Sequence, residues 1–240
     1  MRRVVVTGAN RGLGLEMTRQ LLAAGHEVVA AAREPKLADE LQKIVSGAGE
    51  RAAVVRLDVA DPDSVAAAAL HVGERLEAVD LLVNNAGVWS APGHPERVSA
   101  GALADLRAEP VLDVLRVNAV GPILVTQALA PLLAAARSSV VVNLSSGLGS
   151  IAGATGRGNV GYGMSKAALN MLTRHLAAEL ARQGTVVVAM SPGWVATDMG
   201  GPQATLRPDE SVRGLLNVVD ALTPAQSGAF LDHTGATLPW

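Results

Sequence analysis

Tyr162 and Lys166 are the two residues of this 240-residue chain whose types and spacing point most directly to chemistry. Residues four apart share one face of a helix, so the lysine ammonium would lie one turn from the tyrosine hydroxyl. A neighbouring cation favours the phenolate, and we expect it to lower the pKa of Tyr162 from its ordinary value of about 10 toward neutrality. Because Tyr162 is the only tyrosine and Lys166 one of three lysines, chance rarely produces this spacing. The pair predicts a general acid or base.

Two adjacent serines, Ser145 and Ser146, follow an apolar run at residues 140–144. Ligands of open α/β sheets bind at the carboxyl ends of the strands, where a serine hydroxyl can hydrogen-bond a substrate carbonyl oxygen. Neighbouring strand residues point to opposite faces, so we expect one of the two serines to meet the ligand. Asn118, taken alone, is more readily explained as a helix-bending or capping residue. The five histidines are scattered and cysteine is absent, which predicts neither a histidine-activated nucleophile nor a metal site.

Residues 7–14 read Thr-Gly-Ala-Asn-Arg-Gly-Leu-Gly and lie between a strand-like run and a helical segment. Glycine permits a sharp turn and lets backbone N–H groups approach a phosphate, which the positive end of the helix dipole also attracts. The turn predicts a dinucleotide site that includes Gly8, Asn10, Arg11, Gly12, Leu13 and Gly14. Asn85-Ala86-Gly87, after another strand-like run, is expected to line the same site.

The end of the second predicted strand indicates which dinucleotide is bound. Enzymes that prefer NAD usually carry an acid there to hold the ribose 2′-hydroxyl, whereas this strand ends in Arg33. Arg33 can hold a 2′-phosphate through a bidentate fork, and Arg11 can reach the same phosphate from the glycine turn. Glu34 weakens the argument, and both arginines could instead be solvated surface residues. On balance, the charges favour NADP(H).

Strand-like and helical segments alternate along the whole chain. Apolar runs of strand length lie at residues 3–7, 27–32, 53–57, 81–83, 140–144, 186–189 and 229–231, and Ala- and Leu-rich helical segments at 13–24, 62–76, 122–136 and 164–182. Strands that are apolar at nearly every residue indicate a sheet covered on both faces, and the alternation indicates parallel pairing. We therefore predict an α/β, Rossmann-type, doubly wound and mainly parallel seven-stranded sheet, in a single domain that spans residues 1–240.

Composition excludes several other classes of function. Hydrophobic residues make up 49% of the chain and charged residues 18%, which suits a large buried core. The net charge of −2 gives no basic field for nucleic acid or anionic lipid. The long apolar stretch at 123–136 is too short to cross a bilayer, which takes about 20 residues. We expect a cytoplasmic protein that binds neither nucleic acid nor a membrane.

Taken together and in order, these motifs resemble the short-chain dehydrogenase/reductase family. They are the glycine turn, Asp58-Val59, Asn84-Asn85-Ala86-Gly87, Asn118, Ser146, Tyr162-x-x-x-Lys166 and Pro192-Gly193-Trp194-Val195-x-Thr197. The end of the chain, with Phe230-Leu231-Asp232 and Leu238-Pro239-Trp240, is similar to a carbonyl-reductase-like subgroup that includes the C-factor and sniffer proteins. The resemblance implies an NADP(H)-dependent enzyme that exchanges a hydride with a small carbonyl or alcohol substrate.

The resemblance also implies a role for each matching residue. Tyr162 would be the catalytic acid/base, Lys166 would tune it and bind ribose, Ser146 would orient the carbonyl, and Asn118 would hold a water in a relay to Lys166. Asp58 would contact the adenine, Asn85 the adenosine side, and Val195 and Thr197 the nicotinamide amide, with Val59, Ala86, Gly87 and Pro192 beside them. The subgroup alignment favours Ser146 over Ser145, although Ser146 and Tyr162 are sixteen positions apart, which exceeds the commonest family spacing.

Substrate, partners and the extent of turnover are less constrained. Residues expected to shape an apolar substrate pocket are Trp89, Leu148, Val160, Trp194, Met199 and the loop at 200–208, and the glycine-rich stretch 147–161 is expected to form a flap beside it. Apolar helices leave a monomer, a homodimer and a homotetramer open. The alternative function is an NADP(H)-binding signalling or sensor protein with little turnover.

Overall fold

The computed structural model describes residues 1–90, 106–155 and 159–240. Seven strands form one sheet in the order β3-β2-β1-β4-β5-β6-β7, and each neighbouring pair is parallel. The strands are β1 (Arg3–Thr7), β2 (Glu27–Ala32), β3 (Ala52–Arg56), β4 (Leu81–Asn84), β5 (Ser139–Leu144), β6 (Thr185–Ser191) and β7 (Phe230–Asp232). The predicted Rossmann-type fold is confirmed, and the pairing is parallel throughout rather than mainly parallel.

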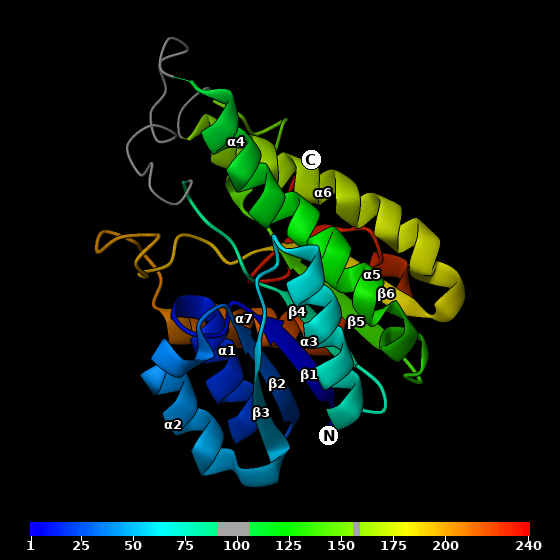
Figure 1. The fold of residues 1–240 in the computed structure, drawn as a ribbon. Helices are drawn as coiled ribbons and strands as arrows, with labels where there is room; N and C mark the ends of the chain where they lie inside the picture. The colour runs from blue at the N-terminus through cyan, green and yellow to red at the C-terminus, as the bar shows by residue number, and fades with distance from the viewer. Residues whose placement is uncertain (91–105, 156–158) are drawn as a thin grey trace.

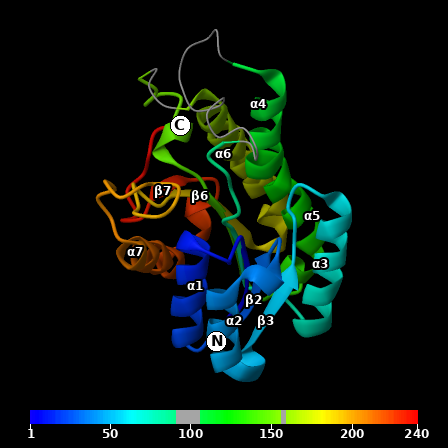
Figure 2. The same cartoon turned by 60° about the vertical axis from the view of Figure 1, so that its left-hand side comes forward.

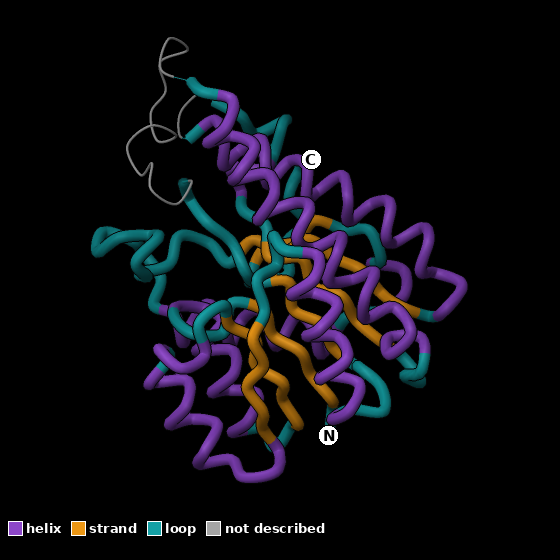
Figure 3. Tube along the Cα trace, in the orientation of Figure 1, coloured by secondary structure: helices purple, strands orange, loops and turns teal. Residues whose placement is uncertain are grey.

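Helices cover both faces of the sheet (Figures 1 and 2). They are α1 (Gly12–Ala23), α2 (Asp39–Ala48), α3 (Pro62–Arg75), α4 (Ala108–Leu115), α5 (Gly121–Ala134), α6 (Val160–Leu180) and α7 (Pro208–Ala221). One face carries α1, α2 and α7, and the other carries α3, α5 and α6. Figure 3 shows the strands enclosed between these two helical layers.

Alternate residues of each strand supply the two halves of the core. Val4 and Val6 of β1 face the layer that includes Met17 of α1, whereas Val5 faces the layer that includes Leu129 of α5. A strand buried on both faces must be apolar at successive positions, which explains the unbroken Val and Ala runs of the sequence. The small side chains of these strands suit close packing of the helices on the sheet.

The order of the strands fixes where a ligand can enter. The chain moves outward from β1 through β2 to β3, and then returns to add β4 on the other side of β1. The connections therefore diverge between β1 and β4, which leaves a crevice at the carboxyl ends of these neighbouring strands. The glycine turn, the segment after β4 and the serines after β5 all lie along this edge of the sheet.

Two helices differ from their predicted limits. The predicted helix at 164–182 begins at Val160, because the Asn159 side chain accepts a hydrogen bond from the Tyr162 N–H at 3.0 Å and caps the first turn. The helix predicted at 122–136 extends back to residue 108, and a π-helical turn (Arg116–Val120) joins α4 to α5. The predicted flap is not a loop throughout: it includes a 3-10 turn (Gly147–Gly149) and the first turn of α6, and residues 156–158 of it lie outside the described residues.

One helical stretch in the described part of the chain, Ala108–Ala134, is long and apolar enough by composition to cross a membrane. Val125, Leu129 and Leu133 on this stretch are buried against the sheet and α3. Packing within the core accounts for these three residues, whereas Leu112 and Ile123 on the same stretch are exposed by 55% and 40%.

Candidate active site

The glycine turn between β1 and α1 is shaped for close backbone approach. Gly8 and Gly12 have φ angles of 65° and 55°, a left-handed region that favours glycine. A Cβ on Gly14 would lie 2.3 Å from the Gly8 carbonyl oxygen and 2.4 Å from Asn85 Nδ2, so only glycine fits there. The Asn85 side-chain amide donates to the carbonyl oxygens of Thr7 (2.8 Å) and Gly8 (3.0 Å), which fixes the turn from the neighbouring strand end.

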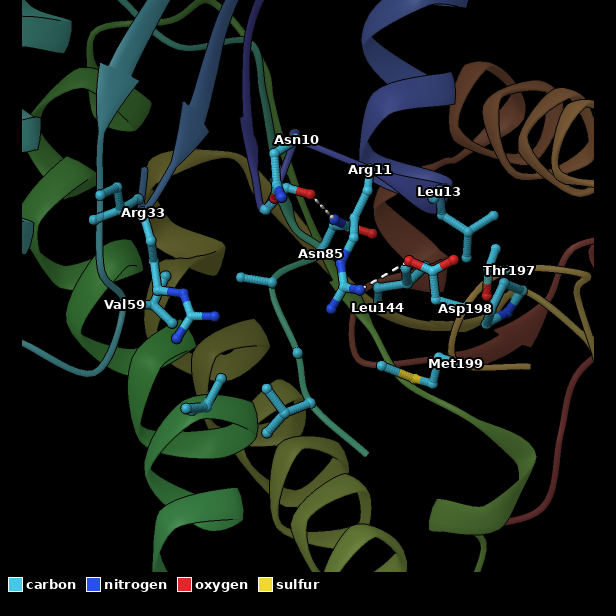
Figure 4. A pocket seen from close by; sticks show the side chains of 18 of the residues that line it. Asn10, Arg11, Leu13, Arg33, Val59, Asn85, Leu144, Thr197, Asp198 and Met199 are labelled. Atoms are coloured by element: carbon cyan, nitrogen blue, oxygen red, sulfur yellow. Dashed lines mark hydrogen bonds and ion pairs between the residues drawn. The ribbon is translucent and has the colours of Figure 1, made fainter. Parts of the chain in front are cut away.

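A cavity of about 280 Å³ opens from this turn along the carboxyl edge of the sheet (Figure 4). It is lined by nearly all the residues predicted to bind a cofactor: Gly8, Asn10, Arg11, Gly12, Leu13, Arg33, Asp58, Val59, Asn85, Ala86, Gly87, Tyr162, Lys166, Pro192 and Thr197. Two predicted residues do not line it. Gly14 is buried beneath the turn, and Val195 is buried at 4% exposure.

The two arginines lie apart in this cavity rather than side by side. Arg33 lies near Val59 on one side, whereas Arg11 reaches toward Asp198, the residue after Thr197 (Figure 4). Arg11 Nη1 and Asp198 Oδ2 form a 2.8 Å ion pair in which both side chains are exposed. An exposed ion pair is worth little energy, so it would not prevent Arg11 from turning toward another anion. Arg33 lines its end of the cavity beside Glu34, and none of the ion pairs formed by the described residues includes it.

Tyr162 and Lys166 are both buried, at 7% and 4% exposure, in the first turns of α6. Lys166 Nζ lies 5.6 Å from the centroid of the Tyr162 ring and donates a 2.7 Å hydrogen bond to the Leu144 carbonyl oxygen at the end of β5. The predicted pair therefore shares one helical face and one wall of the cavity.

The pKa values of the pair differ from the sequence-based expectation. Burial raises the pKa of Tyr162 to about 12, although a hydrogen bond with Ser146 acts in the opposite direction. Burial also lowers the pKa of Lys166 to about 8. The rise at Tyr162 is opposite to the predicted fall of the tyrosine pKa, because burial disfavours the charged phenolate. At neutral pH both groups therefore carry their protons.

The two adjacent serines, Ser145 and Ser146, have different surroundings in the structure. Ser145 lines the cavity, but it is buried and its hydroxyl donates to Asn170 Oδ1 at 2.6 Å, so this hydroxyl is already engaged. Ser146 is half-buried and accepts a hydrogen bond from the Leu148 N–H at 3.2 Å, and its side chain lies near enough to the Tyr162 hydroxyl to lower the pKa of that group. Ser146 and Tyr162 thus present two hydroxyls side by side where one carbonyl oxygen could accept from both.

Asn118 occupies the π-helical turn and is fully buried. Its Oδ1 accepts from the Val88 N–H and its Nδ2 donates to the Val88 carbonyl oxygen, both at 2.8 Å, while Nδ2 also donates to Ser165 Oγ at 2.9 Å. Asn118 therefore ties the segment after β4 to α6 from within the π-helical turn. Single π turns of this kind are frequent at functional sites.

Of the residues predicted to shape a substrate pocket, Trp89 packs on Tyr162 itself. The Trp89 ring lies 4.7 Å from the Tyr162 ring at a tilt of 38°. Of the other residues predicted to shape the pocket, Met199 lines the cavity, and Leu148, Val160 and Trp194 are exposed by 46%, 38% and 53%. The Trp194 indole donates to the Gly200 carbonyl oxygen at 2.8 Å, which holds the start of the loop at 200–208.

Sequence reasoning missed three residues that hold this site together. Asn159 caps α6 and donates through Nδ2 to the Trp89 carbonyl oxygen at 2.8 Å. Asn170 links Ser145 to the Gly149 carbonyl oxygen, and Ser165 links Asn118 to the Tyr162 carbonyl oxygen. An Asn three residues before Tyr162 was a readable capping signal, whereas the other two depend on contacts distant in sequence.

A Rossmann-type sheet with this edge of glycine, serine, tyrosine and lysine defines an oxidoreductase domain, and the chain belongs to the short-chain dehydrogenase family, whose model matches residues 2–207. Its predicted identification with this family is confirmed. The C-signal protein of Myxococcus xanthus is 43% identical over 165 residues, which cover 68% of this chain and 93% of that protein. Among solved structures, the NADPH-bound carbonyl reductase from chicken fatty liver has a TM-score of 0.92 and 39% identity, with 100% and 99% of the two chains covered. The carbonyl reductase Sniffer of D. melanogaster has a TM-score of 0.90 and 31% identity, with both chains covered completely.

Proposed function

We propose that this protein is an NADPH-dependent reductase of aldehydes or ketones that can also oxidise the corresponding alcohols. The observation that carries the proposal is the placement of Tyr162 and Lys166 together on the wall of the glycine-turn cavity, with the Ser146 side chain near the Tyr162 hydroxyl. Two donors at one point suit an oxygen on which negative charge develops. The similarity to the NADPH-bound carbonyl reductase from chicken fatty liver supports the same chemistry.

The cavity fits a nicotinamide dinucleotide phosphate. The backbone at Gly8 and Gly12 would approach the pyrophosphate. Position 8 has no room for a larger residue, since a Cβ there would lie only 2.8 Å from Ala86 Cα. Arg33 would hold the 2′-phosphate, while Pro192 and Thr197 would border the nicotinamide. When bound, NADPH would supply the hydride that reduces the carbonyl carbon.

Tyr162 would act as the proton donor. With its pKa raised to about 12 by burial, the phenol keeps its proton at neutral pH and can give it to the carbonyl oxygen. Ser146 would hold that oxygen with a second hydrogen bond. Lys166, still charged below its pKa of about 8, would stabilise the phenolate that remains. Asn118 would act through the backbone at Val88 and through Ser165 to keep this arrangement in place.

Replacement of Tyr162 by phenylalanine tests the proposal most directly. The variant removes the proton donor and little volume, and we expect kcat for a panel of benzaldehyde, acetophenone and cyclohexanone to fall by about 10²- to 10⁴-fold. NADPH affinity, measured by cofactor fluorescence, should change little. Near-normal turnover by the variant with cofactor bound would refute the role of Tyr162. NADH used as efficiently as NADPH would refute the assignment of Arg33.

A second function is a signalling or sensor protein that binds NADP(H) and turns over little. The observation that favours it is the 43% identity to the C-signal protein. Tight NADPH binding without NADPH-dependent reduction of any member of the panel would support this alternative. Three properties of the protein stay predictions. They are a cytoplasmic location, the lack of nucleic-acid and membrane partners, and the choice among monomer, homodimer and homotetramer.

A further inference from the structure

Trp240, which the proposed chemistry does not use, is held against the molecule although it is 38% exposed. The chain folds back after β7: Leu238 N–H donates to the Phe230 carbonyl oxygen at 2.8 Å, and Leu231 and Thr237 form an antiparallel bridge. This return stacks the Trp240 ring on the buried Phe230 ring, with centroids 5.4 Å apart. The Arg174 guanidinium of α6 lies 6.0 Å from the Trp240 centroid. Figures 1 and 2 both place this end of the chain beside α6.

Trp240 also holds the loop that follows the Ser146 turn. Its carbonyl oxygen accepts from the Ala152 N–H at 2.7 Å and from the Ser150 hydroxyl at 3.4 Å. Ser150 Oγ in turn accepts from the Gly153 N–H at 2.9 Å. Ile151, between these contacts, is 76% exposed, so little apolar packing holds the loop down. Among the hydrogen bonds of the described residues, those that tie residues 150–153 to a distant part of the chain end on Trp240.

The loop is coupled to the Ser146 hydroxyl through a short 3-10 turn. Ser146 Oγ accepts from the Leu148 N–H, and the Ser150 N–H donates to the Gly147 carbonyl oxygen at 3.1 Å. Asn170 holds the inner side of this turn through the Gly149 carbonyl oxygen. A shift of residues 150–153 would therefore move the turn whose amide fixes the direction of the Ser146 hydroxyl.

We propose that Trp240 is a positioning residue for carbonyl reduction, because it holds residues 150–153 and thereby keeps Ser146 directed toward the substrate oxygen. The inference rests on the proposed function. The Trp240 ring stacked on Phe230 and the Trp240 backbone oxygen that accepts from Ser150 and Ala152 together form what we call the clasp. Loss of the ring would weaken the hold on that oxygen as well. A misplacement of about 1 Å at a reacting group can cost as much as about 10²-fold in rate, so a loosened clasp is expected to affect turnover more than cofactor binding.

The test compares Trp240→Ala, Trp240→Phe and the wild type. Leu70→Ala is the matched control, since Leu70 is a 71% exposed apolar residue on α3. We expect Trp240→Ala to lower kcat for benzaldehyde by about fivefold, the size of one lost aromatic contact. NADPH affinity should stay within about twofold of the wild type, as expected for a clasp that touches no cofactor-binding residue. Hydrogen exchange followed by mass spectrometry should rise in peptides that cover residues 147–155. Trp240→Phe should restore most of the turnover and the protection, and Leu70→Ala should change neither.

Several results would overturn the positioning role. These are unchanged kcat in Trp240→Ala, faster exchange throughout the molecule with weaker NADPH binding, or failure of Trp240→Phe to restore turnover. Unchanged exchange at residues 147–155 in a protein that reduces benzaldehyde would reject the positioning role alone. A wild-type protein that binds NADPH but reduces no member of the carbonyl panel would reject the proposed function, and the positioning role with it.

Discussion

Replacement of Lys166 by methionine is expected to stabilise the fold while it abolishes activity. Lys166 is 4% exposed, and none of the ion pairs formed by the described residues includes it. Its ammonium has one protein hydrogen bond, to the Leu144 carbonyl oxygen. A charge that is buried with so little compensation destabilises the folded state, and it is retained here beside the tyrosine proposed to do the chemistry.

The size of the effect follows from the lysine pKa. Burial lowers this pKa from 10.5 to about 8, which at 1.36 kcal/mol per pH unit corresponds to a cost of about 3 kcal/mol at pH 7. Methionine has a similar length and no charge, but it leaves the Leu144 carbonyl oxygen without its partner at a cost of about 1 kcal/mol. We therefore expect the free energy of unfolding of Lys166→Met to exceed that of the wild type by about 2 kcal/mol at pH 7.

The advantage of the variant should disappear at alkaline pH. The folded protein releases the Lys166 proton near pH 8, whereas the unfolded chain keeps it until about pH 10.5. Between these values the unfolded state binds more protons, so the stability of the wild type rises with pH. At pH 9.5 the wild type should have regained about 2 kcal/mol, which brings the two proteins close to equal stability.

Urea unfolding at pH 7 and pH 9.5 measures both quantities. Lys36→Met is the matched control because Lys36 is exposed, and it should behave as the wild type does at both pH values. A Lys166→Met variant less stable than the wild type at pH 7 would refute the reasoning. So would a difference that stays constant between the two pH values, since the cost would then not come from the buried charge.

Four further substitutions test other parts of the site. Ser146→Ala should lower kcat by about 10²-fold in steady-state reduction of benzaldehyde, whereas Ser145→Ala should lose stability through its bond to Asn170 and keep most of the turnover; the reverse result would exchange the two serines. Arg33→Ser should raise KM for NADPH by about tenfold or more and leave KM for NADH unchanged, as expected when a charge-assisted hydrogen bond to a phosphate is lost. Gly14→Ala places a methyl group against the Gly8 carbonyl oxygen and should cost about 1–3 kcal/mol in urea unfolding; unchanged stability would mean that the turn moves freely.

The parallel sheet and the gathering of candidate residues at its carboxyl edge could be predicted because both leave local signals in the sequence. Continuous Val and Ala runs mark strands buried on both faces, and the residues that follow each run must gather at one edge of a parallel sheet. The sequence-based prediction therefore found Gly8, Ser146 and Tyr162 before their contacts were known. It could not choose between Ser145 and Ser146 from the residues alone, because that choice depends on Asn170, which lies 25 positions further along the chain.

The features that the sequence did not predict depend on contacts and burial, which residue types and spacing alone do not specify. Gly161 and Gly163 are poor helix formers, so the first turn of α6 is visible only once Asn159 is seen to cap it. The role of Asn118 depends on the Val88 backbone thirty residues away. The pKa of Tyr162 depends on how completely the ring is buried, with Trp89 packed against it, and spacing along a helix carries no information about burial.

Burial shifts the pKa values of Tyr162 and Lys166 in opposite directions, and at neutral pH both groups carry their protons. The pKa of Tyr162 rises and that of Lys166 falls, so each group moves toward its neutral form. Below about pH 8 the tyrosine still has its proton to give and the lysine still has its charge to stabilise the phenolate afterwards. Oxidation of an alcohol would instead require the phenolate first, which burial disfavours. Reduction therefore starts from the protonated tyrosine that burial favours, and the lysine charge that weakens the fold is placed to stabilise the phenolate left behind.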